Sequence, residues 1–504
     1  MFRRPMTVAQ RLVGAMALLA LLNALAHFVP PERAGHEPDD AVYVAMAGGR
    51  PYGDLAATAV QDPSRPITWL FWLGLARAFG FEPAPQLILL MLVTTVLSWA
   101  VLALARLFLP ETEALLVAAV YVVLPMKHEA YGTLLYAPVD LAAALYLGSA
   151  IAYVRFARSG SASWLTASAL AYGLAMMGYE LGAFAPLLLL ALARIPAASR
   201  RKAALAFGIV IATIAARRLL VDSALGPLPA RHPVFSSVAL LRNLVTTLPS
   251  WLMGPHALRT IGYGLQGFFS LPTMWMSVAL LSLAAFFEWL RRELPAVAPL
   301  PRRAAVAALL AAVVLTLPAA LILVESRHTM IALAPLAAVA LEILRRISLR
   351  SPAFAASCGA LLLMSSQGLA LRQAEHGRIT WAMREAVGQV APGLTQGRRL
   401  VYDLDSFARA IPHAWGRPGH DTFRAYWGMH TFSVVGLRRL ATLSGMDAAS
   451  PTPLVCATPL RHDGDEIVCD RHLQMSAPFR VPAQDAVILD YSAVCGAPAA
   501  RCPR

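Results

Sequence analysis

Charged residues are scarce in this chain, and the motifs of most soluble enzymes are missing. Only 14% of its 504 residues are Asp, Glu, Lys or Arg. The sequence has no Gly-x-Ser-x-Gly turn, no Walker loop, no Gly-x-Gly-x-x-Gly motif preceding a helix and no His-Glu-x-x-His motif. Acyl hydrolysis, nucleotide-dependent chemistry and zinc proteolysis therefore have no support in the sequence.

Acidic residues are the scarcer of the two signs, with 29 against 43 basic residues, so the formal net charge is +14. Such a charge invites a nucleic-acid partner. The Lys and Arg residues, however, stand in short clusters between apolar runs, where membrane topology places them. No basic stripe is interleaved with aromatic residues on a soluble module, so we expect no nucleic-acid partner.

Long apolar runs fill most of the chain, which is 58% hydrophobic. Only helices satisfy their own backbone in a bilayer core roughly 30 Å thick. The sequence predicts about eleven spans, at 12–30, 86–108, 112–126, 134–156, 163–179, 181–195, 203–221, 272–291, 303–324, 328–345 and 352–371. The first run could instead be a cleaved signal, but it continues past its small-residue site through Phe28 and Val29.

The basic clusters set the sidedness of this prediction. With the N-terminus inside, the later Arg clusters all fall inside as well, as the positive-inside rule requires. Residues 66–81 would reverse this order if they spanned, so we expect an interfacial or re-entrant helix there, with Trp69 and Trp72 at headgroup level. The outer regions are then the loops 31–85 and 222–271 and the tail 372–504.

The tail has its own character. It begins with an amphipathic stretch, TWAMREAVGQV, and continues with the strand-like runs RRLVYDL, TPLVCAT and DAVILDY, which predict a small α/β domain. Four of the five cysteines lie there, and their spacing favours one or two disulfides in an oxidising compartment. Several pairings remain possible for these four residues, Cys456, Cys469, Cys495 and Cys502.

The first outer loop carries an acidic pair, Asp39 and Asp40, within HEPDDAVYV. At the start of a helix from Pro38 the dipole alone would favour both acids. Alternatively, one acid takes a proton from an acceptor hydroxyl or ligates a divalent cation, with Tyr43 on the face of Asp39. Carboxylates beside hydrocarbon are costly, which favours the functional alternative.

Two further outer segments carry ionisable groups. In MKHEAYG, His128 and Glu129 either belong to a solvated loop or complete a cation site with Asp40. Asp140 begins the next span and needs a buried partner or a solvated cavity. Glu180, in the short turn MGYELGAF, either caps a helix or faces a cavity.

Near the outer end of a later span, ESRHTMIALAPLAAVAL contains Arg327 and His328. The planar guanidinium suits a phosphate through two parallel donors, although an internal pair of Arg327 with Glu325 is the alternative. In the tail, HDGDE at 462–466 matches no complete calcium loop, and we interpret it as a surface turn.

In this order, the motifs resemble those of the polytopic GT-C glycosyltransferases, which include the protein mannosyltransferases and the aminoarabinose transferase of lipid A. The likeness covers roughly residues 10–345. The matching segments are DDAVY, RPITWLFWLGLARAFG, YAPVDLAAALY, YELGAFAPLLLLALAR and SRHTMIALAPLAAVAL.

The resemblance implies an all-α polytopic membrane protein, residues 1–371, followed by a periplasmic α/β domain, residues 372–504. It implies an inverting transferase of the bacterial inner membrane that moves a sugar from a polyprenyl-phosphate donor to a periplasmic glycan, lipid or protein. Asp39 or Asp40 would serve as base, and Arg327 would hold the lipid phosphate. The expected substrate-binding residues are Arg327, His328, Tyr43, Glu180 and Asp140.

A divalent cation, Mg²⁺ or Mn²⁺, is the candidate cofactor, with Asp40, His128 and Glu129 as ligands. Two other functions stay open. A transporter or flippase of lipid-linked glycans would show paired interrupted spans with charges near the midplane, whereas most charges here stand at span ends. A non-catalytic membrane scaffold that presents the C-terminal domain is the third possibility.

Overall fold

The computed structural model describes residues 7–27, 66–79, 83–125, 137–192, 196–225, 255–269, 273–320, 330–394, 397–403, 405–406, 446–447, 450–456, 458–470, 478–490 and a few single positions. Most of the described chain is helical. The helices are α1 (Val8–Ala26), α4 (Pro66–Phe79), α5 (Pro83–Ala105), α6 (Glu111–Val123), α8 (Ala137–Ser159), α9 (Ala162–Gly178), α10 (Ala185–Leu192), α11 (Ala197–Leu225), α14 (Pro255–Phe268), α15 (Thr273–Glu293), α16 (Arg302–Ala320), α17 (Met330–Ser348) and α18 (Pro352–Val390).

Each of the eleven apolar segments predicted to span overlaps one of these helices within the described residues, although in 181–195 the helix is only Ala185–Leu192. Within the described residues, four helical segments are long and apolar enough to cross a membrane by length and composition. They are Val8–Ala26, Pro85–Ala105, Ala137–Ser159 and Pro352–Leu371. The chain is a membrane protein on this ground, while the full count of eleven spans stays a prediction.

Contacts between charged residues bring many helix ends to one end of the helical body, which we call the basic end. Glu111 at the start of α6 lies 3.7 Å from Arg11 of α1 and 3.9 Å from Arg106 after α5. Arg158, in the last turn of α8, donates to the carbonyl of Leu107. The basic clusters that the sequence assigned to one side therefore meet in space.

The connection from α15 to α16 also reaches the basic end. After the 3₁₀ turn η6 (Leu294–Ala296), the amide of Ala298 donates to Glu113 of α6 over 3.4 Å, and the amide of Leu300 donates to Glu342 of α17 over 3.0 Å. The last turn of α17 and the first turn of α18 are joined only by Leu349–Ser351. Both helices therefore have an end here.

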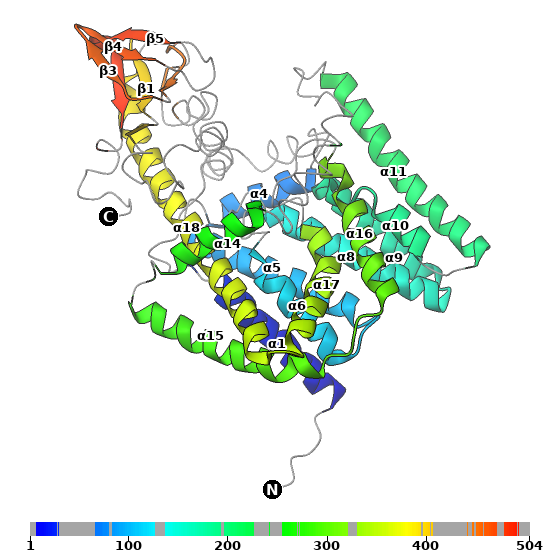
Figure 1. Ribbon diagram of the computed structural model, residues 1–504. Helices are drawn as coiled ribbons and strands as arrows, with labels where there is room; N and C mark the ends of the chain where they lie inside the picture. The colour runs from blue at the N-terminus through cyan, green and yellow to red at the C-terminus, as the bar shows by residue number, and fades with distance from the viewer. Residues whose placement is uncertain are drawn as a thin grey trace.

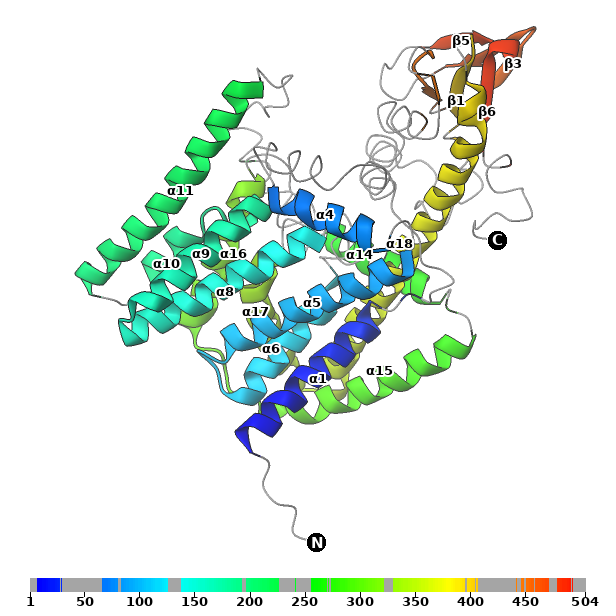
Figure 2. The same ribbon diagram turned by 180° about the vertical axis from the view of Figure 1, so that it is seen from behind.

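Two short helices lie near the other end of the helical body, which we call the opposite end. Figures 1 and 2 show α4 and α14 there, away from the start of α1 and on the side toward which α18 extends. The expected helix at 66–81 is thus a separate 14-residue element, α4, ahead of the long α5. The sequence did not predict α14, because its glycines weaken the helical pattern.

Gly264 of α14 serves close packing against α18. A Cβ at Gly368 of α18 would overlap the carbonyl of Gly264 and the amide nitrogen of Phe268, so the two backbones touch there. Beside this crossing, Ser365 donates to the carbonyl of Ile261 over 3.2 Å. Small residues that let backbones approach are the usual basis of helix association in membranes. The sequence GYGLQG at 262–267 is therefore part of a helix contact.

Hydroxyl and amide groups join other helix pairs inside the body. Ser149 of α8 and Ser168 of α9 exchange hydrogen bonds, each donating to the other's carbonyl over 2.8 Å. Asn23 of α1 donates to Thr94 and Thr95 of α5 over 2.8 and 3.1 Å. Because few partners exist in hydrocarbon, such bonds fix which helix faces meet.

Large apolar side chains on the outside of the helices are exposed. Leu92 of α5, Leu174 of α9 and Leu281 of α15 are 57%, 42% and 73% exposed. In a soluble protein such a surface would drive aggregation, whereas in a bilayer it contacts lipid tails at no cost. The exposed surface therefore agrees with a membrane-embedded body.

Helix α18 continues without a break through the predicted boundary at residue 371 and leads to two small sheets (Figure 1). One is parallel, in the order β2-β1-β6, from Arg399–Asp403 (β1), Leu454–Cys456 (β2) and Ala486–Leu489 (β6). The other is antiparallel, from Arg461–Asp463 (β3), Glu466–Cys469 (β4) and Phe479–Pro482 (β5). The three strand-like runs read from the sequence form the parallel sheet.

Two further expectations for the tail are met. Cys456 and Cys469 form a disulfide that joins the two sheets, with the Cα atoms 5.8 Å apart. The HDGDE segment turns from β3 to β4 at Gly464, whose φ of +61° favours glycine. The independence of residues 372–504 as a domain stays a prediction, because α18 belongs to both parts.

Candidate functional site

The order of the helices along the chain places the segments with candidate residues at the opposite end of the helical body. Helices α1 and α6 leave the basic end and α8 returns to it, so residue 27, residue 124 and residue 137 lie at their far ends. Likewise α16 leaves the basic end and α17 returns to it, so the ends that flank residues 321–329 lie at the opposite end. The four segments with candidate residues are thus all attached there.

A compact turn carries Glu180 at this end. Glu180–Gly182 form a 3₁₀ turn, η4, between α9 and α10. The Tyr146 hydroxyl of α8 donates to the carbonyl of Tyr179 over 2.9 Å, and the Tyr172 hydroxyl of α9 donates to the carbonyl of Ala183 over 2.9 Å. Two tyrosines therefore hold the backbone on both sides of Glu180.

Close packing fixes the same turn against α8. A Cβ at Gly182 would lie only 2.6 Å from the Tyr146 ring, so only glycine lets the turn approach it. The carbonyl of Gly178, at the end of α9, accepts a hydrogen bond from Thr68 of α4 over 2.6 Å. Helix α4 is thereby tied to the segment that precedes Glu180.

Asp140 occupies the first turn of α8 and has no exposed surface. The dipole at a helix start stabilises a carboxylate, and burial raises the cost of its charge unless other groups compensate for it. Asp140 is therefore an acid held inside the body near the opposite end, on the helix that also supplies Tyr146.

The end of α6 is fixed by α18. Ser366 donates to the carbonyl of Val123, the last residue of α6, over 2.9 Å. This carbonyl has no partner within its own helix, so the serine satisfies a group that would otherwise be left open. The neighbouring Ser365 binds α14, so one turn of α18 contacts both elements.

Most of the candidate residues lie outside the described part of the chain. They are Asp39, Asp40, Tyr43, His128, Glu129, Arg327 and His328. The structure brings Glu180 and the start of α8, with Asp140, into one region, and it places the ends that carry the other segments on the same side. The roles assigned to all nine residues stay predictions.

The candidate metal ligands Asp40, His128 and Glu129 are among the residues outside the described part of the chain. Within the described ranges, no group of three or more His, Cys, Asp or Glu side chains has a metal-binding arrangement. The divalent cation therefore stays a prediction, and no step of the chemistry below is assigned to one.

Sequence reasoning did not single out Thr68, Tyr146 or Tyr172. Each is an ordinary residue of an apolar helix, and its role depends on a carbonyl from another element. Tyr146 could have been noticed, because it stands six residues after Asp140 in YAPVDLAAALY. The other two give no signal in the sequence.

Solved structures similar to this chain are membrane sugar transferases. The crystal structure of ArnT from Cupriavidus metallidurans bound to undecaprenyl phosphate is 12% identical, with a TM-score of 0.38, over 94% of this chain and 98% of that one. Its apo form is 13% identical, with a TM-score of 0.40, over 94% and 99% of the two chains.

An oligosaccharyltransferase of Archaeoglobus fulgidus, tethered to an acceptor peptide, is 14% identical, with a TM-score of 0.31, over 88% of this chain and 56% of that one. These proteins belong to the GT-C group that the sequence motifs resemble. No known family matches the chain by sequence, and no curated protein matches it.

Proposed function

We propose that this chain is a membrane glycosyltransferase that moves a sugar from a polyprenyl-phosphate donor to an acceptor at the opposite end of the helical body, on the periplasmic face of a bacterial inner membrane. One observation carries the proposal. The helix ends that hold the acidic first loop, the 126–136 loop, Glu180 and the 321–329 segment share the end away from the basic clusters.

The chemistry needs few groups. Asp39 or Asp40 takes the proton from the acceptor hydroxyl, whose oxygen attacks the anomeric carbon. The bond from this carbon to the phosphate oxygen breaks, and the lipid phosphate leaves with the electron pair. Arg327 stabilises the charge that grows on this phosphate. Direct displacement of this kind inverts the anomeric carbon.

The described residues would position these groups. Tyr146 and Tyr172 fix the turn that contains Glu180, and Thr68 ties α4 to it. A catalytic group placed on fixed elements loses less freedom when the substrate binds. We infer that Glu180 binds the sugar or the acceptor through its carboxylate. Asp140 stays a predicted substrate-binding residue, because its side chain has no exposed surface.

Transfer by the purified chain in nanodiscs tests the proposal, with the sugar product followed by mass spectrometry. The donor and acceptor are found first, by comparing envelope glycans and lipids from cells with and without the protein. Asp39→Asn and Asp40→Asn together should lower the rate by at least about 100-fold, as expected for loss of a general base. Asp62→Asn, in the same outer segment, is the matched control and should retain activity.

Two outcomes would reject the proposal. In the first, the doubly substituted protein makes the same amount of product as the parent. In the second, the chain moves a lipid-linked glycan across the bilayer without forming a new glycosidic bond, which would show a transporter. Arg327→Lys should lower turnover, because lysine cannot offer the two parallel donors of arginine. Arg292→Lys, in the last turn of α15 at the basic end, is the control and should retain activity.

A further inference from the structure

A cavity of about 200 Å³ lies at the basic end, away from the proposed catalytic face. It opens between α6, the connection 297–301 and α17, and its walls are mostly apolar. Val117, Leu300, Ala338 and Leu341 line it. A cavity with this lining favours a hydrocarbon chain over water.

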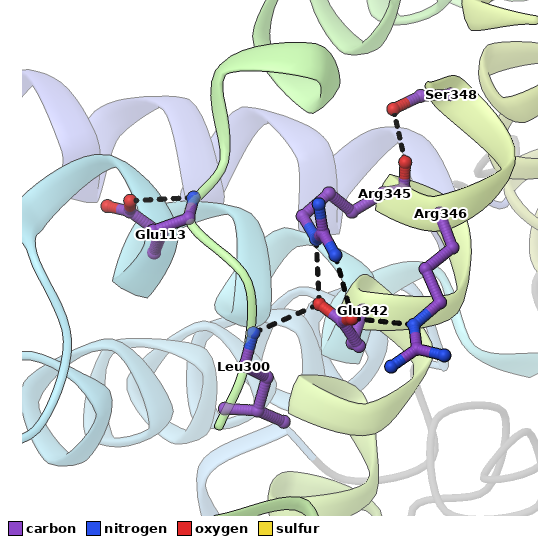
Figure 3. A network of polar contacts seen from close by, with 7 residues as sticks. Glu113, Leu300, Glu342, Arg345, Arg346 and Ser348 are labelled. Carbon is purple, nitrogen blue, oxygen red and sulfur yellow. Dashed lines mark hydrogen bonds and ion pairs between the residues drawn. The ribbon is translucent and has the colours of Figure 1, made fainter. Parts of the chain in front are cut away.

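The two carboxylates in the wall are already engaged by the protein. Glu113 accepts from the amide of Ala298, and Glu342 accepts from the amide of Leu300 over 3.0 Å (Figure 3). Both acids thus hold the 297–301 connection in place. The cavity therefore keeps its shape through contacts that involve no ligand.

Glu342 is also clamped by two arginines of its own helix, within the sequence Glu-Ile-Leu-Arg-Arg. Arg345 binds it through Nε and Nη2 over 2.7 and 2.9 Å, and Arg346 binds it through Nε over 2.7 Å. The three charges sum to +1. Arg345 is 11% exposed, whereas Arg346 is 72% exposed, and Figure 3 shows the terminal nitrogens of Arg346 directed away from Glu342.

More positive charge stands beside the cavity. Pro301 lines it, and the next two residues, Arg302 and Arg303, are exposed at the start of α16. Three exposed arginines are therefore adjacent to residues of the cavity wall: Arg302 and Arg303 follow Pro301, and Arg346 is bound to Glu342. Arginine matches the geometry of a phosphate through parallel donors.

We propose that this cavity binds an anionic phospholipid, with the phosphate on Arg346, Arg302 and Arg303 and an acyl chain in the cavity. Basic pockets between helices on the cytoplasmic side of a membrane bind anionic lipid headgroups in this way. The proposal does not depend on the proposed transferase activity, because no candidate catalytic residue lies at this end.

A second group of one glutamate and two arginines with the same spacing provides a matched control for the Glu342, Arg345 and Arg346 group, and we call each group a clamp. Glu288, Arg291 and Arg292 stand in Glu-Trp-Leu-Arg-Arg at the end of α15, with Arg291 bound to Glu288 over 2.7 and 2.8 Å. Arg292 is 71% exposed, almost the same as Arg346. The two arginines share the same pairing and exposure, but the α15 clamp does not line the cavity.

Binding is measured on the full chain in nanodiscs of phosphatidylcholine, titrated with phosphatidylglycerol and followed by native mass spectrometry. We expect Arg346→Ala to weaken binding of phosphatidylglycerol about threefold to tenfold, as for loss of one charged contact. Arg292→Ala should stay within about twofold of the parent. Equal losses in the two variants, or equal binding of the two lipids by the parent, would overturn the proposal.

A second variant keeps every charge and fills the cavity. Ala338→Leu should also weaken binding of phosphatidylglycerol, because its side chain takes the space of the acyl chain. Unchanged thermal unfolding in pure phosphatidylcholine shows that each variant is folded. Glycerol phosphate at the same concentration should not compete with phosphatidylglycerol for binding. If it competes as well as the lipid does, the site binds an anion without an acyl chain, which contradicts the proposal.

Discussion

The crossing of α14 and α18 gives a sharp test of the described structure. A Cβ at Gly368 would overlap the Gly264 carbonyl and the Phe268 amide, and these backbone atoms cannot rotate away. Replacing glycine by alanine in a helix stabilises it by roughly 0.5–1 kcal/mol. Forcing an extra carbon into a packed contact costs roughly 1–3 kcal/mol. The second effect is larger, so Gly368→Ala should lower the free energy of unfolding by about 1–2 kcal/mol.

Gly388 of the same helix is the control. A Cβ there meets no atom within 4 Å, so only the gain in helix stability applies. We expect Gly388→Ala to raise the free energy of unfolding by about 0.5–1 kcal/mol. Thermal unfolding of the purified proteins in one detergent compares the two substitutions. If Gly368→Ala stabilises the protein as Gly388→Ala does, α14 does not cross α18 at this point.

Three further perturbations have expected outcomes. Glu342→Gln should lower the free energy of unfolding by about 2–3 kcal/mol, because it weakens a nearly buried pair, whereas Glu288→Gln in the exposed clamp should change the melting temperature little. Reducing the disulfide of Cys456, which closes a loop of 13 residues, should destabilise the tail by about 3 kcal/mol in a proteolysis assay, and an unchanged cleavage rate would contradict this. Burial, and then the Asp403 carboxylate, raise the pKa of the Tyr402 hydroxyl well above its usual value. The free energy of unfolding therefore has its full contribution from Tyr402 at neutral pH and loses it as the pH rises past about 10. Tyr402→Phe should remove this alkaline loss in a pH series of unfolding curves.

The helices could be predicted from the sequence because apolar length is a strong signal. The predicted segment at 352–371, however, became the helix Pro352–Val390, since the first break in the helical pattern comes only at Pro392. An apolar composition predicts which residues lie in hydrocarbon. A helix, however, ends where the backbone amide and carbonyl groups lose their partners within the helix. The predicted span therefore ends at residue 371, whereas the helix continues to Val390.

The elements that sequence reasoning missed depend on distant partners. Helix α14 contains three glycines within six residues, which reads as a turn until α18 is placed against it. The antiparallel sheet was missed because β3 and β4 are three and four residues long. The three strands of the parallel sheet were predicted from their apolar runs, which are buried in β1 and β2 and mostly half-buried in β6.

At the candidate site, the sequence supplied the residue types and the common side of the membrane. It could not supply the hydrogen bonds of Tyr146, Tyr172 and Thr68, because each pairs a side chain with a carbonyl of another element. The two Glu-x-x-Arg-Arg clamps were visible in the sequence as a repeated pattern. Only the structure separates them, since one borders a cavity and the other does not.

Cysteine labelling in spheroplasts tests the central claim most directly, which is that the acidic first loop and the tail face the compartment opposite to the basic end. A membrane-impermeant maleimide should react with Ala41→Cys and His462→Cys in intact spheroplasts. It should reach Ser159→Cys and Leu349→Cys, at the basic end, only after the membrane is opened. Labelling of residue 41 and residue 349 from the same side would contradict the account.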